Sequence, residues 1–365
     1  MKTGFTTGSC AAAAAGAAAT MLFLQAEIKE IEIMTPKGIP FHAEIHDAVI
    51  NNKWASCAVR KYSGDDPDVT NGTLIYARVG YIKEGMDGEI VIDGGEGVGR
   101  VTKPGLDQPV GNAAINSVPR AMITSEIKKV TGKYGYDGAL SVIIYVPEGN
   151  KLAEKTFNSK LGIEGGISII GTSGVVEPMS ERALLHTIFL EMKQKKALGK
   201  EYILLTPGNY GRDFIKDEYG LSEDMSVKCS DFVGDVLDMA NTLGFKGVLF
   251  VGHIGKLSKV ALGVMNTHSK YGDRRMEAIV RAAGELGDGQ KNEIMEAATT
   301  EEAVNILSRI GIKEKVMKRL LDMIEYHMRA KADIDIEIIL YSRMHGLLAK
   351  TAGAESFVKK IKEKR

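Results

Sequence analysis

The first twenty-four residues constrain the fold more than any other stretch of the chain. They read MKTGFTTGSCAAAAAGAAATMLFL, a hydroxyl-rich turn over residues 4–10 followed by a run made mostly of alanine. Alanine has the highest helix propensity, and a helix of small side chains lets another backbone or a flat ligand approach closely. The stretch therefore predicts a helix over residues 11–24. Thr7 or Ser9 is expected to be its N-cap, because a hydroxyl oxygen can accept an amide hydrogen of the first turn.

The turn before this helix carries the groups of an anion-binding site. Its hydroxyls and free amides would lie at the positive end of the helix dipole, where a carboxylate is stabilised. A surface helix with a good cap and a secretion signal are the two alternatives. The secretion signal is disfavoured because Lys2 is the one early charge, the turn is polar, and no polar spacer with a cleavage site precedes folded-looking sequence.

Length and charge narrow the class of protein. The chain has 365 residues, of which 44% are apolar, so we expect two domains with ordinary cores. The chain has 47 Lys and Arg residues and 47 Asp and Glu residues, so it has no excess of positive charge that would attract nucleic acid. Cys10, Cys57 and Cys229 show no zinc spacing and suit a reducing compartment. We expect a cytoplasmic protein without a nucleic-acid or membrane partner; a monomer and a homo-oligomer both stay open.

The residues up to 164 predict an α+β domain with a mixed sheet. Alternating stretches rich in β-branched residues are separated by turn residues, which is typical of strands. These stretches are residues 28–34, 39–45, 54–60, 73–82, 89–93 and 140–146.

Near residue 165 the pattern changes, and residues 165–365 predict a three-layer α/β domain with a mainly parallel sheet. Short apolar strands at 167–170, 202–205 and 247–251 are each followed by a glycine-rich loop and a helix. A late strand at 334–340 fits either sheet.

The loops after these three strands offer polar and cationic side chains. In open parallel sheets ligands bind at the carboxyl ends of the strands. Hydroxyl, amide, guanidinium, imidazole and ammonium groups together suit an anionic, oxygen-rich ligand. The residues expected to bind it are Thr172, Ser173, Asn209, Arg212, His253 and Lys256.

Residues 90–99 read IVIDGGEGVG, the Asp-x-Gly-x-Gly-x-Gly pattern of nucleoside-cofactor loops. In Rossmann-like methyltransferases such a loop lets the backbone approach S-adenosylmethionine. A helix should follow at once, but residues 100–105 are extended and then broken, so a loop over an active site and a plain hairpin are the stronger readings. The candidate cofactor-binding residues are Asp93, Gly95, Gly97 and Gly99.

Three carboxylates, Asp65, Asp66 and Asp68, fall within four positions of a loop. Carboxylates suit a hard cation, but the loop lacks the glycine and glutamate of an EF-hand, and we assign no metal ligands. A solvated turn stiffened by Pro67 is favoured by the spacing alone. Clustered carboxylates can also raise one another's pKa and act as an acid or base.

Five motifs in chain order make the sequence resemble the CbiD family. They are residues 4–13 (GFTTGSCAAA), 64–72 (GDDPDVTNG), 95–99 (GEGVG), 171–174 (GTSG) and 251–256 (VGHIGK). Phe5 departs from the Gly-Tyr associated with the family and removes one hydroxyl. The resemblance implies methyl transfer from S-adenosylmethionine to carbon 1 of cobalt-precorrin-5B, giving cobalt-precorrin-6A in anaerobic cobalamin biosynthesis. S-adenosylmethionine would be the co-substrate, and the substrate would carry the cobalt.

The resemblance also implies roles for the motif residues. The substrate is a macrocycle edged with acetate and propionate groups, which Thr6, Thr7 and Ser9 would bind together with the second-domain loops. The carboxylates at 65, 66 and 68 would act as catalytic groups near the sulfonium or the reacting carbon. A non-catalytic corrinoid carrier is the alternative. A metal-dependent hydrolase or kinase is disfavoured by the lack of a Walker pattern.

Overall fold

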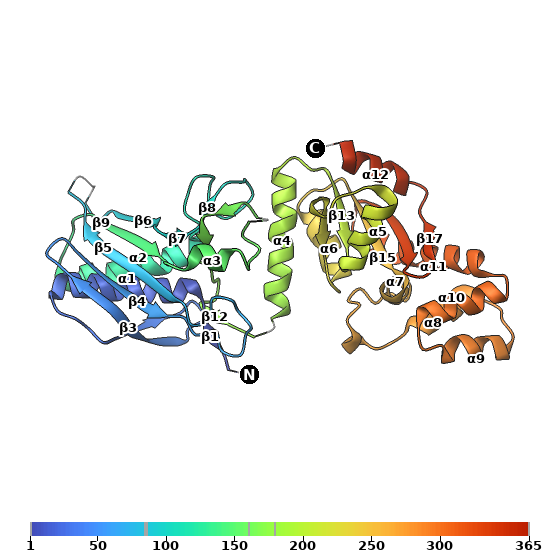
Figure 1. Cartoon of the computed structure of the whole chain (residues 1–365), viewed down its shortest axis with the longest axis horizontal. Coiled ribbons are helices and arrows are strands. Elements are labelled where there is room, and N and C mark those ends of the chain that lie inside the picture. The colour runs from blue at the N-terminus through green and yellow to red at the C-terminus, as the bar shows by residue number, and fades with distance from the viewer. Residues whose placement is uncertain (1, 84–86, 160, 179, 364–365) are drawn as a thin grey trace. The chain divides into compact units, whose positions relative to one another are not determined.

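The computed structural model of the chain describes residues 2–83, 87–159, 161–178 and 180–363. They form two compact units, Met1–Glu181 and Arg182–Arg365 (Figure 1). The boundary expected at 164/165 lies inside the first unit, because two strands after it still pair there. β11 (Gly166–Ile167) runs parallel to β7 (Gly97–Val98), and β12 (Val175–Val176) pairs antiparallel with β1 (Gly4–Phe5).

The first unit contains a six-stranded mixed sheet, as predicted for an α+β domain. In spatial order the strands are β2 (Glu30–Met34), β3 (Pro40–Ile50), β4 (Trp54–Arg60), β5 (Leu74–Tyr81), β9 (Leu140–Tyr145) and β6 (Ile90–Gly94). Neighbouring strands are antiparallel except β9 and β6, which are parallel. Shorter elements follow the sheet: β8 (Arg100–Val101), β10 (Ile163–Glu164) and α3 (Gly149–Ala153).

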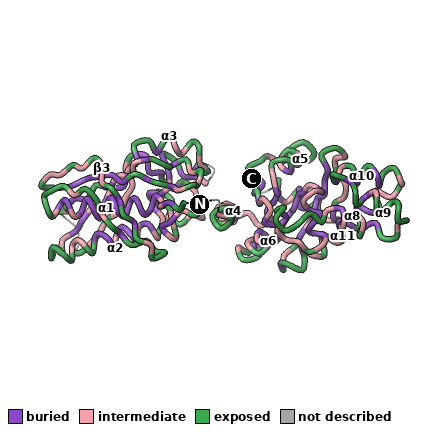
Figure 2. Tube along the Cα trace, turned by 90° about the horizontal axis from the view of Figure 1, so that it is seen from below, coloured by how far each residue is buried: buried purple, intermediate pink, exposed green. Residues whose placement is uncertain are grey.

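Helix α1 (Thr7–Leu24) is the centre of this unit. It lies between the sheet and α2 (Ser117–Tyr134), as Figure 2 shows. Its small side chains allow both contacts: a Cβ at Gly16 would lie 3.1 Å from Ile31 of the sheet and 3.3 Å from Glu126 of α2. α1 is long and apolar enough to cross a membrane, yet 83% of it is buried inside the protein. Its alanines therefore fit the packing of a core helix.

The second unit contains a five-stranded sheet. In spatial order the strands are β14 (Ser226–Lys228), β13 (Tyr202–Thr206), β15 (Gly247–His253), β16 (Asp335–Ser342) and β17 (Gly346–Lys350). The first four are parallel and β17 is antiparallel to β16, so the late strand belongs to this sheet.

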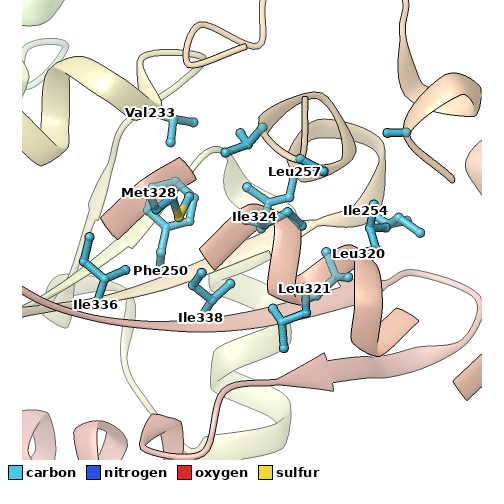
Figure 3. Close-up of a cluster of buried hydrophobic side chains, with 14 of the residues drawn as sticks. Val233, Phe250, Ile254, Leu257, Leu320, Leu321, Ile324, Met328, Ile336 and Ile338 are labelled. Carbon is cyan, nitrogen blue, oxygen red and sulfur yellow. The ribbon is translucent and has the colours of Figure 1, made fainter. Parts of the chain in front are cut away.

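Helices cover both faces of this sheet, which confirms the three-layer α/β prediction. The α-helices described in the second unit are α4 (Glu181–Ala197), α5 (Asn209–Tyr219), α6 (Val233–Thr242), α7 (Ile254–Val260), α8 (Arg275–Ala283), α9 (Asp288–Glu296), α10 (Thr300–Arg309), α11 (Lys313–Arg329) and α12 (Ala354–Glu363). On one face Phe250, Ile336 and Ile338 of the strands pack against Leu257 of α7 and Ile324 of α11 (Figure 3). On the other face, α5 and α12 cover a separate core.

Candidate functional site

The sheet of the second unit has a topological switch point between β13 and β15. The chain passes from β13 to β14 on one side of it and then to β15 on the other. Ligands of open α/β sheets bind at the carboxyl ends of the strands at such a point. These ends are Thr206 and His253, so Asn209, Arg212 and Lys256 follow them at the expected edge.

The end of β13 and the start of α5 offer polar groups at this edge. Its N-cap, Gly208, supplies no side-chain acceptor to the first-turn amides. Thr206 beside it is fully buried, and its Oγ1 has no hydrogen-bond partner within residues 2–83, 87–159, 161–178 and 180–363. A Cβ at Gly211 would lie 3.1 Å from the Cβ of Thr206, so the two segments are in close contact. Amides at a helix start favour an anion, and a buried unpaired hydroxyl calls for a partner.

His253 is held by the protein on both ring nitrogens. Its Nδ1 accepts from the Gly255 amide at 2.9 Å, so the proton is on Nε2, which donates to Glu301 Oε1 at 3.0 Å. Burial lowers the pKa of His253 even though Glu301 acts to raise it, and the ring is neutral at pH 7. His253 therefore caps α7 and bonds Glu301, and substrate binding by His253 stays a prediction.

Glu301 of α10 connects three elements at this edge. It accepts hydrogen bonds from His253 and from the hydroxyl of Ser342, which ends β16, and lies 3.8 Å from His345 Nε2. Burial would raise the pKa of Glu301, but the bonds from Ser342 and His253 lower it. This network was not predicted from the sequence. Ser342 could have been predicted, because ligands bind at the carboxyl ends of parallel strands and Ser342 ends the late strand.

The two cations expected to bind substrate here have protein partners. Lys256 Nζ donates to Asp231 Oδ1 at 2.7 Å, and Thr267 donates to the same oxygen at 2.8 Å. Burial would raise the pKa of Asp231, but these two bonds lower it. Arg212 Nε donates to Ser226 Oγ at 3.0 Å at the start of β14. An incoming anion would have to share or displace these contacts.

In the first unit, the turn at the start of α1 is filled by another segment of the chain. Thr6 is the N-cap, where Thr7 or Ser9 was expected: its hydroxyl accepts from the Ser9 amide at 3.2 Å. Thr7 Oγ1 accepts from the Ile170 amide at 2.9 Å, and Ser9 Oγ donates to the Gly174 carbonyl at 2.6 Å. Thr7 and Ser9 are buried, and backbone groups of residues 170–174 occupy the place predicted for an anion.

Thr172 and Ser173 lie in the first unit, and the prediction that they edge the parallel sheet is wrong. Residues 167–170 form no strand of that sheet; β11 pairs with β7 in the first unit. At Gly171 a Cβ would lie 2.2 Å from Thr6 Oγ1, so this glycine allows the turn to pack on the start of α1. The start of the short apolar run does pair in parallel, but with β7 of the first unit and not with the sheet of the second unit.

The carboxylate loop contains a buried cation that the sequence analysis missed. Lys61 is 2% exposed, and its Nζ donates to Asp68 Oδ2 and to Ser63 Oγ. The amide and hydroxyl of Thr70 donate to Asp68 Oδ1 at 2.8 Å and 2.7 Å. Burial would raise the pKa of Asp68, but Lys61 and Thr70 lower it. Asp68 is therefore an ionised counter-ion of Lys61, which argues against the predicted acid or base role.

Asp65 and Asp66 differ in their surroundings. Asp65 Oδ2 accepts from the Lys2 amide at 2.6 Å, so this carboxylate fixes the N-terminal segment. At Gly64 a Cβ would lie 2.1 Å from the Lys2 carbonyl oxygen, which explains the glycine. Asp66 is half-buried, and its amide donates to the Ser63 carbonyl at 3.3 Å. A catalytic role for Asp66 stays a prediction.

The glycine-rich loop is packed against protein. Asp93, predicted to bind the cofactor, is engaged by both Nη atoms of Arg100 at 2.8 Å. Gly97 has φ 71°, and a Cβ there would lie 1.7 Å from the Val146 carbonyl oxygen. A Cβ added at Gly95 would meet the side chain of Ile143, and a Cβ added at Gly99 would meet that of Ile163. At these glycines the close backbone approach predicted for a cofactor is made by other segments of the chain, and cofactor binding by this loop stays a prediction.

Comparison with known proteins gives full-length matches. The family model CbiD matches residues 1–178, and the model for the CbiD C-terminal domain matches residues 266–352. The cobalt-precorrin-5B C(1)-methyltransferase of Ruminiclostridium cellulolyticum is 45% identical over 99% of this chain and 95% of its own length. That of Clostridioides difficile is 37% identical, covering 98% and 96%. The crystal structure of the cobalamin biosynthesis protein CbiD from Archaeoglobus fulgidus is 26% identical, covers 75% of this chain and 84% of that one, and has a TM-score of 0.41.

Proposed function

The chain belongs to the CbiD family, and we propose that it transfers a methyl group from S-adenosylmethionine to carbon 1 of cobalt-precorrin-5B, giving cobalt-precorrin-6A. The similarity to enzymes of that name over nearly the whole of both chains carries the proposal. The cobalt belongs to the substrate. The protein itself contributes binding and orientation, because methyl transfer from a sulfonium needs the two carbons about 3–3.5 Å apart, in line and shielded from water.

We propose that the methyl donor binds at the carboxyl edge of the second unit's sheet. The switch point between β13 and β15, the amides at the start of α5 and the unpaired hydroxyl of Thr206 support this assignment. The carboxylate of the donor's methionine part suits the helix start, where an anion gains about 0.3–1 kcal/mol. S-adenosylmethionine, when bound, supplies the electrophilic methyl group; the Thr206 hydroxyl and the α5 amides would orient it.

The other residues predicted to contact the substrate fall into two groups. Asn209 and Arg212 at the start of α5 stay candidates for binding an anionic group, and Arg212 would share the guanidinium that donates to Ser226. Thr7, Ser9 and His253 already have protein partners, and we assign them positioning roles. The carboxylate of Asp66 stays the candidate for stabilising charge during transfer.

The test of the function is turnover by the purified chain with S-adenosylmethionine and cobalt-precorrin-5B. We expect mass spectrometry to show a tetrapyrrole product one methyl group heavier, together with S-adenosylhomocysteine. Binding of the macrocycle without any turnover would favour the corrinoid carrier instead.

The donor site has its own test by calorimetry with S-adenosylhomocysteine. Thr206→Val keeps the shape of the side chain and removes the hydroxyl, and we expect about a 2- to 10-fold weaker affinity because a hydrogen bond contributes about 0.5–1.5 kcal/mol. Thr187→Val on α4 is the matched control. Equal affinities of wild type and Thr206→Val would refute this placement of the donor and leave the methyltransferase activity to the first test.

A further inference from the structure

One face of the six-stranded sheet in the first unit is uncovered. Side chains alternate along each strand, and Cys57 of β4 faces α1, since its Sγ lies 3.3 Å from the Ala14 carbonyl oxygen. Trp54 and Ser56 therefore face the opposite way. α1 lies on the Cys57 side of the sheet, and α2 packs on α1. Figure 2 shows the short helix α3 on the other side, where it packs against β7 and β11.

Aromatic residues from three adjacent strands gather on this open face. We call Trp54, Tyr76, Arg78 and Tyr145 the Trp54 patch. The rings of Tyr76 and Tyr145, which are paired across β5 and β9, stack with centroids 4.9 Å apart. The hydroxyls of Ser56 and Tyr145 lie 2.6 Å apart. These contacts hold the two tyrosine rings in place, so this part of the patch is preformed.

Arg78 supplies a cation within this patch. Its guanidinium carbon lies 4.8 Å from the ring centroid of Trp54 and 5.8 Å from that of Tyr145. The side chain is exposed, and no carboxylate of the described residues pairs with it. Stacking on a ring uses the faces of a guanidinium and leaves its in-plane N–H groups, a fork that matches a carboxylate.

We infer that the Trp54 patch binds the tetrapyrrole-derived macrocycle, with Arg78 holding one of its peripheral acetate or propionate groups. The inference rests on the proposed function, which supplies a ligand that is both flat and edged with carboxylates. The aromatic rings match the flat part, and the guanidinium, which has no carboxylate partner among the described residues, matches the charged edge. Burying apolar ring surface would hold the macrocycle, and the ion pair would fix its orientation.

The test compares two corrinoids as probes. In cobyrinic acid the peripheral carboxylates are free, whereas in cobinamide they are amides. Trp54 is the one tryptophan of the chain, so its fluorescence reports binding. We expect Arg78→Gln to bind cobyrinic acid about tenfold or more weakly than wild type, because a hydrogen bond to a charged group is at stake, and to bind cobinamide as wild type does. Arg78→Lys keeps the charge without the planar fork and should fall between the two.

The matched control is Lys133→Gln on α2, which removes a cation lying 5.7 Å from the ring of Tyr134. It should bind both probes as wild type does. Equal affinity of wild type and Arg78→Gln for cobyrinic acid, including no binding by either, overturns the inference. So does a wild-type dimer that Arg78→Gln converts to a monomer, because the face would then be a subunit interface.

Methyl-transfer assays separate this inference from the function on which it rests. An inactive wild type would refute the proposed function. An active wild type with an equally active Arg78→Gln at low substrate concentration would refute the docking surface alone. We expect Arg78→Gln to raise KM about tenfold or more, with kcat changed far less.

Discussion

Replacing Asp68 by asparagine is expected to destabilise the first unit by about 3–5 kcal/mol. Lys61 is 2% exposed, and Asp68 is its one carboxylate partner among the residues that the structure describes. Removing one member of a buried ion pair leaves an uncompensated buried charge, which costs about 3–5 kcal/mol. The asparagine still accepts from Thr70, so the loss comes mainly from the charge of Lys61.

The same pair makes stability depend on pH. Burial alone would raise the pKa of Asp68, but the charge of Lys61 lowers it below 3.8. A carboxyl group with a lower pKa in the folded than in the unfolded state contributes stability that is fully present above the unfolded pKa and is lost as pH falls through the folded pKa. Below pH 3.8 wild type should lose this contribution, and Asp68→Asn should lack that part of the acid dependence.

Urea unfolding followed by tryptophan fluorescence measures the effect in the correct unit, because Trp54 lies in the first unit. Asp65→Asn is the control: its carboxylate is exposed and accepts a bond from a backbone amide. The double variant Lys61→Met, Asp68→Asn removes both charges and should recover much of the loss. A midpoint for Asp68→Asn equal to that of the control, or no recovery in the double variant, would show that Lys61 is hydrated and the reasoning is wrong.

Three further outcomes are expected. Asp66→Asn should lower kcat for methyl transfer about 10²–10⁴-fold with an unchanged melting temperature; normal turnover would leave the loop a structural turn. Gly97→Ala should lower the urea midpoint more than Gly72→Ala does. Both positions have positive φ, which costs an alanine about 1–3 kcal/mol, but only at position 97 would the new Cβ lie 1.7 Å from a carbonyl oxygen. The three cysteines are buried, and burial raises the pKa of each thiol to about 12, so a thiol reagent should label them only after unfolding; rapid labelling of the native chain would contradict this.

The sequence by itself determined the elements whose signal is local. The alanine run predicts α1, because helix propensity depends on the residues of the helix itself. The stretches between turn residues predict β4 and β5 almost to the residue, because turn residues are local signals for where a strand begins and ends. The apolar strands at 202–205 and 247–251 lie in the parallel sheet as predicted. The family could also be identified from the sequence, because the five motifs and their order are read directly from it.

Only the tertiary structure decided which of these motifs touch each other. The amides of Thr6 and Gly8 and the hydroxyl of Ser9 at the start of α1 donate to carbonyl oxygens of residues 170–174, a pairing over long sequence separation that no local pattern records. Lys61 and Asp68 are neighbours in sequence, but whether their charges are buried or hydrated depends on what the fold places above them. The glycines of residues 95–99 could serve either a ligand or another strand. The glycines in the sequence predict that some backbone approaches closely there. The fold shows that this backbone belongs to other segments of the chain.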